Sequence, residues 1–501
     1  MTKPSAALLQ ANESRNPIQG FKRTPGRAPL AALAALLFVL AAACSATLAA
    51  PQQPESSNMQ LVGFNDLQGR SAYQPTIHQQ GGRWIAYIGH HGGAAPNPLT
   101  GQVENNGTSI LDVTDPAHPL YLAHIPGEPG TPEKLELGGA QMTRVCDGSS
   151  LPHADKSKVY LLRTFGNSAH ELWDVSDPAK PRRLSVVLGG LRDTHKSWWE
   201  CDTGIAYLVS GDPQWRTRRM IKIYDLSDPE EPVFLRDFGL PGQQPGATGT
   251  APSEVHGPIS TGPKGNRVYV AYGPGRSGIV QILDREKLLN GPKEPTDQNL
   301  LYPQIARVDF PAAAGAHTTF PLLGLDIPEF AKMKDGPRRD FLAVTGESLA
   351  EDCHDSRQMV HFFDITTETA PLGVSTFTVP EASGGFCGRG GRFGTHSSNE
   401  SFAPAYYGRV MFFAHFNAGV RAVDVRDPFH PKEIGYYIPA VTGKTQPRCA
   451  GTAPNQTCKS VIQTNNVEVD DRGYIYIVDR VGTGLHILQL TGPARAAANL
   501  P

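Results

Sequence analysis

Several signals of common functional classes are missing from this sequence. The 501 residues carry a formal net charge of −2 and show no basic stripe, which argues against a nucleic-acid-binding surface. The seven cysteines form no C-x-x-C pair, so neither a thiolate metal site nor a redox dithiol is expected. No G-x-S-x-G serine motif occurs. The glycine-rich stretches 273–275 and 388–392 precede no helical pattern, so no phosphate cradle is indicated.

The sequence does contain a short pattern that recurs along its length. An apolar run ends in D-[VL]-[ST]-D-P-x-x-P, with Arg426 at the Ser/Thr position of one copy. Proline removes a backbone donor and forces a turn after the apolar strand. Full copies occupy residues 110–119, 172–181, 223–232 and 422–431, and degenerate copies occupy residues 282–284, 362–365 and 487–490. Seven copies indicate seven repeats of one structural unit.

Each copy lies between predicted β-strands. An apolar run precedes every copy, as at 84–88 and 205–209, and another strand follows the Asp-Pro turn, as at 119–122. A further strand is expected before each of those runs. Four strands per unit, recurring seven times, predict an all-β fold: a seven-bladed β-propeller of four-stranded antiparallel blades. A propeller is one closed domain, so the chain length does not require a second one.

The repeated D-[VL]-[ST]-D-P-x-x-P element resembles the LVIVD repeat of exported bacterial seven-bladed propeller proteins. The resemblance implies the architecture but says little about activity, because one fold hosts many functions. The propeller is expected to span residues 61–491, after a Pro/Gln/Ser linker at 51–60 and before a loose C-terminal tail at 492–501.

The N-terminus, residues 1–50, has the features of an export signal. A polar, basic stretch over 1–28 precedes an apolar Ala/Leu-rich run over 29–43. Three interpretations remain open: a signal peptide cleaved near 46–50, a lipoprotein signal modified at Cys44, or an uncleaved membrane anchor. Each places the propeller in the periplasm or facing the cell exterior, with membrane contact only through this anchor or lipid.

Cysteine usage agrees with export. Six cysteines follow Cys44, and an even number in an exported chain predicts disulfides. The preferred pairs are Cys146–Cys201, Cys353–Cys387 and Cys449–Cys458. Six cysteines allow 15 connectivities, so this pairing is one alternative among them.

Histidine recurs where the innermost strand of a blade is predicted to begin. In four successive blades this position holds His195, His256, His317 and His396, while the residue that follows differs each time. The corresponding stretches of the other blades are 76–78 (with His78), 142–144 and 465–468. Because innermost strands line the channel of a propeller, equivalent positions should form a ring around one axis. Shared ancestry of the blades is the competing explanation for the repeated histidine.

A second ring is expected from residues at the end of each blade's second strand, which should crowd the same mouth of the channel. Its members are His90 (with His91), Arg163, Ser210, Tyr272, Thr345, His415 and Asp479. Four carboxylates are candidates for a ligand, for a group that orients a ligand, or for a general base: Glu254, Glu347, Glu468 and Asp479. Arg144 and Arg163 near the mouth would favour an anionic substrate. A long insert at 347–360 is a further place where function is expected.

Convergent neutral imidazoles predict a transition-metal site. The candidate ligands are His90, His91, His195, His256, His317, His396 and His415. With no thiolates and few carboxylates, copper is favoured, with iron or zinc as alternatives. The architecture and histidine placement are similar to those of histidine-rich copper propeller enzymes, nitrous oxide reductase and thiocyanate dehydrogenase among them.

The first functional hypothesis is therefore an exported copper oxidoreductase that acts on a small molecule, with Glu468, Asp479 and Arg163 as candidate catalytic residues. One alternative is a metal-assisted hydrolase or lactonase in which Glu468 or Asp479 acts as the base. The other is a non-catalytic propeller that binds a protein or glycan at the cell surface. None of the three involves nucleic acid.

Overall fold

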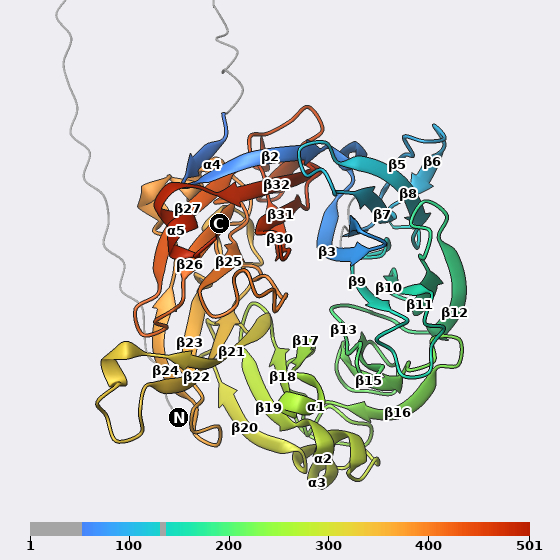
Figure 1. The fold of residues 1–501 in the computed structure, drawn as a ribbon, viewed down its shortest axis with the longest axis vertical. Coiled ribbons are helices and arrows are strands. Elements are labelled where there is room, and N and C mark those ends of the chain that lie inside the picture. The colour runs from blue at the N-terminus through green and yellow to red at the C-terminus, as the bar shows by residue number, and fades with distance from the viewer. Residues whose placement is uncertain (1–52, 131–136, 501) are drawn as a thin grey trace, which may run out of the picture. The chain divides into compact units, whose positions relative to one another are not determined.

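A computed structural model describes residues 53–130 and 137–500, which form a ring of seven four-stranded antiparallel sheets (Figure 1). The predicted seven-bladed β-propeller is confirmed. The export signal predicted for residues 1–50 lies outside the described residues. Among those that are described, no helix is long and apolar enough to cross a membrane.

Within each blade the strands follow one another from the channel outward. The first three blades are β3 (Ala72–Gln80), β4 (Arg83–His90), β7 (Gly107–Asp112) and β8 (Leu120–Pro126); β9 (Thr143–Asp147), β10 (Val159–Phe165), β11 (Ala169–Asp174) and β12 (Arg182–Leu188); and β13 (Trp198–Trp199), β14 (Ile205–Ser210), β15 (Met220–Asp225) and β16 (Val233–Phe238). The next two are β17 (Val255–Ser260), β18 (Arg267–Tyr272), β19 (Ile279–Asp284) and β20 (Gln304–Asp309); and β21 (Thr318–Asp326), β22 (Arg338–Thr345), β23 (Val360–Asp364) and β24 (Leu372–Phe377).

The last two blades recruit strands from the N-terminal end of the propeller. Blade 6 contains β25 (Val410–Ala414), β26 (Val420–Asp424), β27 (Lys432–Ile438) and β1 (Glu55–Ser57), and blade 7 contains β30 (Thr464–Val469), β31 (Tyr474–Asp479), β32 (Leu485–Leu490) and β2 (Met59–Asn65). β2 pairs with β32 and β1 with β27, both antiparallel, so the two ends of the ring are joined by backbone hydrogen bonds. Within the linker predicted at 51–60, residues 55–57 and 59–60 therefore belong to strands, because closing the ring satisfies edge groups that would otherwise stay unpaired.

The C-terminal segment packs against the core. Residues 492–500 begin with helix α5 (Gly492–Ala497), and the side chains of Ala494 and Ala498 are buried against Met59 and Leu490. The apolar face of this segment thus completes the core beside the closing strands. The other helices are short: α1 (Gly262–Gly265), α2 (Arg285–Asn290), α3 (Asp297–Leu301) and α4 (Phe386–Arg389).

The repeated Asp-Pro element connects the third and fourth strands of a blade. In blade 1 the Asp112 carboxylate accepts from the Thr114 N–H (2.9 Å), and the Asp115 carboxylate accepts from the Ala117 N–H (3.0 Å). The Thr114 hydroxyl accepts from the Trp84 N–H at 2.9 Å, which ties the turn to the second strand. The repeat is conserved within the chain because each polar side chain satisfies a backbone donor that the turn would leave free.

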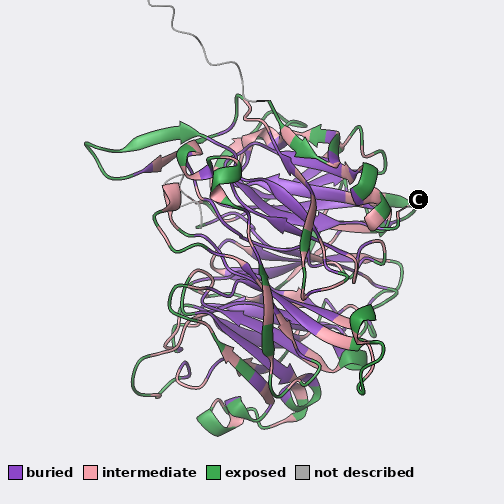
Figure 2. Ribbon diagram, turned by 90° about the vertical axis from the view of Figure 1, so that its left-hand side faces the viewer, coloured by how far each residue is buried: buried purple, intermediate pink, exposed green. Residues whose placement is uncertain are grey.

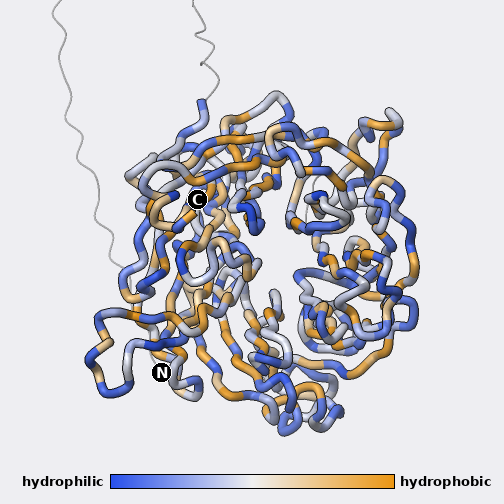
Figure 3. The backbone as a smooth tube through the Cα atoms, in the orientation of Figure 1, coloured by the Kyte–Doolittle hydropathy of each residue, from blue (hydrophilic) through white to orange (hydrophobic). Residues whose placement is uncertain are grey.

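Hydrophobic side chains fill the space between neighbouring blades. Buried residues follow the strands, and exposed ones lie mainly in the connecting loops (Figure 2). Figure 3 shows short hydrophobic and hydrophilic stretches intermixed all around the ring.

Three disulfides join the preferred pairs: Cys146–Cys201, Cys353–Cys387 and Cys449–Cys458. The predicted connectivity is confirmed. The first links blades 2 and 3, and the last spans the small hairpin formed by β28 (Pro447–Ala450) and β29 (Thr457–Ser460). The three disulfides are compatible with an extracellular or periplasmic protein.

Candidate metal centre

In blades 3, 4 and 5 a histidine stands near the start of the innermost strand, and in blade 6 His396 stands on a short segment that pairs with the inner edge of β25 through the Ser398–Phe413 bridge. The N–H groups of His195, His317 and His396 donate to carbonyls of the adjacent strand, at Val209, Thr345 and Ala414. His256 lies within β17 at a bulge, where the register shifts between Val255 and Gly257. A bulge turns a side chain out of the regular alternation, so it can direct a ring into the channel.

These four side chains, called the inner histidines below, are at least 96% buried and lie ring against ring around the channel. The Nε2 atoms of His195 and His256 are 2.9 Å apart. The ring centroids of His256 and His317 are 3.7 Å apart, and those of His317 and His396 are 4.4 Å apart. The blade alignment thus identified four side chains that come together in space.

Backbone carbonyls determine the tautomer of two inner histidines. His256 Nδ1 lies 2.9 Å from the His317 carbonyl oxygen, and His396 Nδ1 lies 2.5 Å from the Asn465 carbonyl oxygen. A carbonyl can only accept, so both Nδ1 atoms carry the proton and both Nε2 atoms keep a lone pair. Metal-binding histidines are oriented in the same way, by a hydrogen bond from the second ring nitrogen.

Glu347 is the carboxylate that reaches the inner histidines. It begins the long insert after β22, and one ligand atom from each of His256, His317 and Glu347 lies within 4.8 Å of the other two. Glu347 Oε1 is 3.8 Å from His396 Nε2 and 3.0 Å from Arg392 Nη1. Of the four carboxylates proposed from the sequence, only the one in this insert contributes to this group.

Blade 1 contributes a tyrosine rather than the predicted histidine. Tyr73 sits in the bulge of β3, between Ala72 and Pro75, and its hydroxyl is 3.3 Å from His195 Nε2. His78 instead lies further along β3, where its Nε2 is 3.0 Å from Asp147 Oδ1. The sequence alignment of blade 1 was shifted because the bulge adds a residue that no periodic pattern marks.

Burial keeps the inner histidines neutral. Desolvation lowers the pKa of all four well below the ordinary value of 6.5. Nearby cations lower each pKa further: Arg219 acts on His195, Lys196 on His256, and Arg480 on His396. At neutral pH the rings therefore carry lone pairs that can serve as ligands.

Three of the inner histidines, His195, His256 and His396, line a small, positively charged cavity of about 150 Å³. Its charged lining comprises Arg218, Arg219, Arg392, Arg480, Glu254 and Glu347. Four cations against two anions give the cavity an excess of positive charge. The sequence offered Arg144 and Arg163 for this role, and neither lines the cavity.

Arg144 and Arg163 form ion pairs away from the cavity. Arg144 lies deeper in the channel and forms an ion pair with Glu400, which also pairs with Lys196. Arg163 is buried against Glu171, with Nη2 to Oε2 at 2.8 Å, and donates to the carbonyls of Ile125 and Pro126. Arg163 therefore holds blades 1 and 2 together, and the geometry gives no support to a catalytic role.

The predicted second ring does not converge on the channel. His90 uses both ring nitrogens on protein atoms: Nδ1 is 3.2 Å from the Ser71 carbonyl oxygen and Nε2 is 2.8 Å from Ser109 Oγ. The His415 ring packs against Phe377, at a centroid distance of 5.8 Å. His91 comes closer, with its ring edge-on to Tyr73 at 5.2 Å and its Nδ1 3.0 Å from Ser71 Oγ. Side chains at the end of a blade's second strand face the neighbouring blade rather than the channel, so this predicted ring does not form.

The two carboxylates predicted as bases serve the backbone. Asp479 accepts from the N–H groups of Gln463 (2.6 Å) and Val481 (2.8 Å) and so holds a loop. Glu468 points into the channel three residues beyond Asn465, and its carboxylate accepts from the N–H groups of Ser401 (3.1 Å) and Val469 (2.9 Å). Burial raises the pKa of Glu468 to about 7. Neither carboxylate lines the histidine cavity.

No protein-family model and no curated protein matches this chain.

Proposed function

We propose that this chain is an exported, metal-dependent oxidoreductase that binds copper at the inner histidines and acts on a small anionic molecule. The observation that supports it is the convergence of four neutral imidazoles and the Glu347 carboxylate at one end of the channel. The repeat's resemblance to the LVIVD element, the three disulfides and the signal-like residues 1–50 support export.

A metal explains the contacts of the rings better than hydrogen bonds among them. His256 Nε2 carries no proton and faces His195 Nε2 at 2.9 Å, a spacing that also suits two ligands of one ion. Among the described residues, His317 Nε2 is buried without a hydrogen-bond partner. A buried polar atom without a partner costs about 1–3 kcal/mol, and coordination would remove that cost.

The donor set favours copper. Imidazole nitrogens with a carboxylate and a phenol nearby suit copper, zinc or iron, and no thiolate is present to select otherwise. Copper, when bound, would supply one-electron chemistry. Arg219, Arg392 and Arg480 would attract and orient an anion in the adjoining cavity, whose volume equals that of about five water molecules. Glu347, held by Arg392, is placed to exchange a proton with that anion.

Metal analysis of the protein after periplasmic expression tests the proposal. The wild type should contain stoichiometric copper with a nitrogen-ligand paramagnetic resonance spectrum. His256→Ala combined with His317→Ala should lower copper affinity by more than about 100-fold, because it removes ligands rather than the groups that orient them.

His361→Ala is the matched control, since His361 is partly buried against Phe310 (centroid distance 5.0 Å) and away from the cavity. It should keep its copper. Calcium or zinc in place of copper would favour the hydrolase, with Glu347 or Glu254 of the cavity lining as its base. Absence of metal after reconstitution would overturn the proposal in favour of a non-catalytic propeller.

A further inference from the structure

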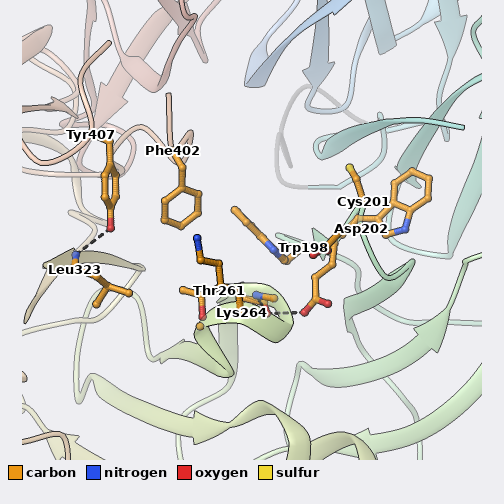
Figure 4. Close-up of a pocket in the computed structure, with 13 residues that line it drawn as sticks. Trp198, Cys201, Asp202, Thr261, Lys264, Leu323, Phe402 and Tyr407 are labelled. Atoms are coloured by element: carbon orange, nitrogen blue, oxygen red, sulfur yellow. Dashed lines mark hydrogen bonds between the residues drawn. The ribbon is translucent and has the colours of Figure 1, made fainter. Parts of the chain in front are cut away.

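The opposite end of the channel holds a second and larger cavity of about 680 Å³ (Figure 4). It lies where the innermost strands end: β13 begins near His195 and ends at Trp199, and β17 runs from the His256 end to Ser260. Its volume falls within the range of small-molecule sites. We propose that this cavity binds a small aromatic carboxylate, independently of the metal centre.

Aromatic faces form one side of the cavity. Phe402 is 36% exposed and lies edge-to-face with Trp198, at a centroid distance of 6.2 Å. The Tyr407 hydroxyl accepts from the Leu323 N–H (2.9 Å) and donates to the Pro321 carbonyl (3.2 Å), so only its ring is left for a ligand. Figure 4 shows these rings facing the cavity from separate segments of the chain. Such a wall binds a flat apolar group by stacking.

The Trp198 ring is held in place from inside the channel. The Arg144 guanidinium lies over it, 4.8 Å from the ring centroid, and is itself fixed by Glu400. A ring that is already ordered loses little freedom when a ligand stacks on it, so the wall is prepared for binding.

Lys264 supplies the charge for recognition. It lies in α1, and Figure 4 shows its side chain directed toward Phe402 and Trp198. The nearby Glu200 is neutralised by Arg285, with Nη2 to Oε2 at 2.6 Å. Asp202, at the α1 side of the rim, is exposed. The cation beside the aromatic wall is therefore available for an anionic group, which identifies the ligand as a ring bearing a carboxylate.

The two ends of the channel are separate sites. Lys196 and Glu400, both at least 98% buried, form an ion pair inside the channel, and Arg144 joins them. The histidine cavity, at about 150 Å³, is also much smaller than this one, at about 680 Å³.

Calorimetric titration with indole-3-acetate and with the uncharged indole-3-acetamide tests the proposal on the full-length protein. The wild type should bind the carboxylate about two- to fivefold more tightly than the amide, as expected for a half-exposed ion pair. Lys264→Gln should abolish this preference and leave amide binding unchanged. Phe402→Leu should weaken both probes about two- to tenfold through loss of ring stacking.

Lys287→Gln, at an exposed lysine beside Tyr302, is the matched control and should keep the preference. The double variant His256→Ala/His317→Ala should bind both probes as the wild type does, which separates this site from the metal centre. The proposal is overturned if neither probe binds the wild type more tightly than about 1 mM, or if Lys264→Gln retains the preference for the carboxylate.

Discussion

The inner histidines differ from His90, His170 and His415, called the outer histidines here, in where their rings point rather than in how deeply they are buried. Both groups are at least 96% buried, and burial lowers the pKa in both. The inner rings face one another, with nitrogens as close as 2.9 Å. Each outer ring instead meets a protein partner in its own surroundings, such as Ser210 Oγ at 3.1 Å from His170 Nε2.

A lowered histidine pKa is therefore no marker of the site in this protein. Desolvation lowers the pKa of any histidine buried in the core. Convergence on the channel also requires that the histidine lie at the innermost strand of its blade. The comparison can be tested by changes that should affect the two groups in different ways.

Acidification should have the largest effect, and it should involve both groups. Burial lowers the pKa of His170 to about 4 and that of His415 to about 3, and the inner histidines are shifted in the same direction. Below about pH 6.5 the unfolded chain binds more protons than the folded protein, so the free energy of unfolding should fall as the pH falls. Each buried histidine can contribute up to about 1.4 kcal/mol per pH unit.

Urea unfolding at about pH 7, 6 and 5 measures this dependence. The inner histidines carry no proton in the folded protein with or without copper, so the copper-loaded and metal-free proteins should lose stability with the same slope, while copper raises the stability at each pH. An unfolding free energy that does not change over this range would contradict the neutral state of both groups.

His90→Ala should destabilise the protein and leave its metal in place. The substitution leaves the Ser71 carbonyl and the Ser109 hydroxyl without the ring that now contacts both, at a cost of about 3 kcal/mol. Thermal unfolding and copper content should be measured on the same sample. His256→Ala should give the opposite result, with a larger loss of copper than of stability. Copper loss from a folded His90→Ala protein would erase the distinction between the two groups.

Tyr73→Phe should have the smallest effect and should report on the inner group alone. It removes the hydroxyl 3.3 Å from His195 Nε2 and keeps the ring that packs against His91 and His396. Copper affinity, measured by competition with a chelator, should fall about tenfold, as for other groups that orient a ligand. Stability should change by less than about 1 kcal/mol. An unchanged affinity would show that Tyr73 only packs beside the site.

The fold was predictable because the sequence repeats the pattern of one blade several times. Four full and three degenerate copies of the repeat count the blades, and the full copies satisfy local backbone donors in the same way, so the same residues fold alike where they recur. The closure of the ring was not predictable in the same way. β1 and β2 carry no copy of the repeat, and their partners lie more than 370 residues away.

The residues of the candidate site were also predictable only where they belong to the repeat. His195, His256, His317 and His396 follow from the blade register, because equivalent positions on inner strands meet at one axis. Tyr73 was missed because a bulge shifts its register, and Arg219, Arg392 and Arg480 were missed because loops bring them to the cavity. One signal could have found Tyr73: residue 73 precedes the first apolar strand by about the same interval as Asn465 does in the last blade.

The sequence alone determined the number of blades and the register of the inner histidines, since both depend on repeated patterns. The structure selected the cysteine pairing from the 15 possible connectivities. The tertiary structure alone decided which charges accompany the histidines. The sequence does not distinguish Glu347 from Glu468 as a candidate ligand. In the structure, Glu347 lies in a long insert folded toward the histidines, whereas backbone N–H groups hold Glu468 within the channel. Long-range packing makes that choice, because loop residues have no period from which their position in space can be read.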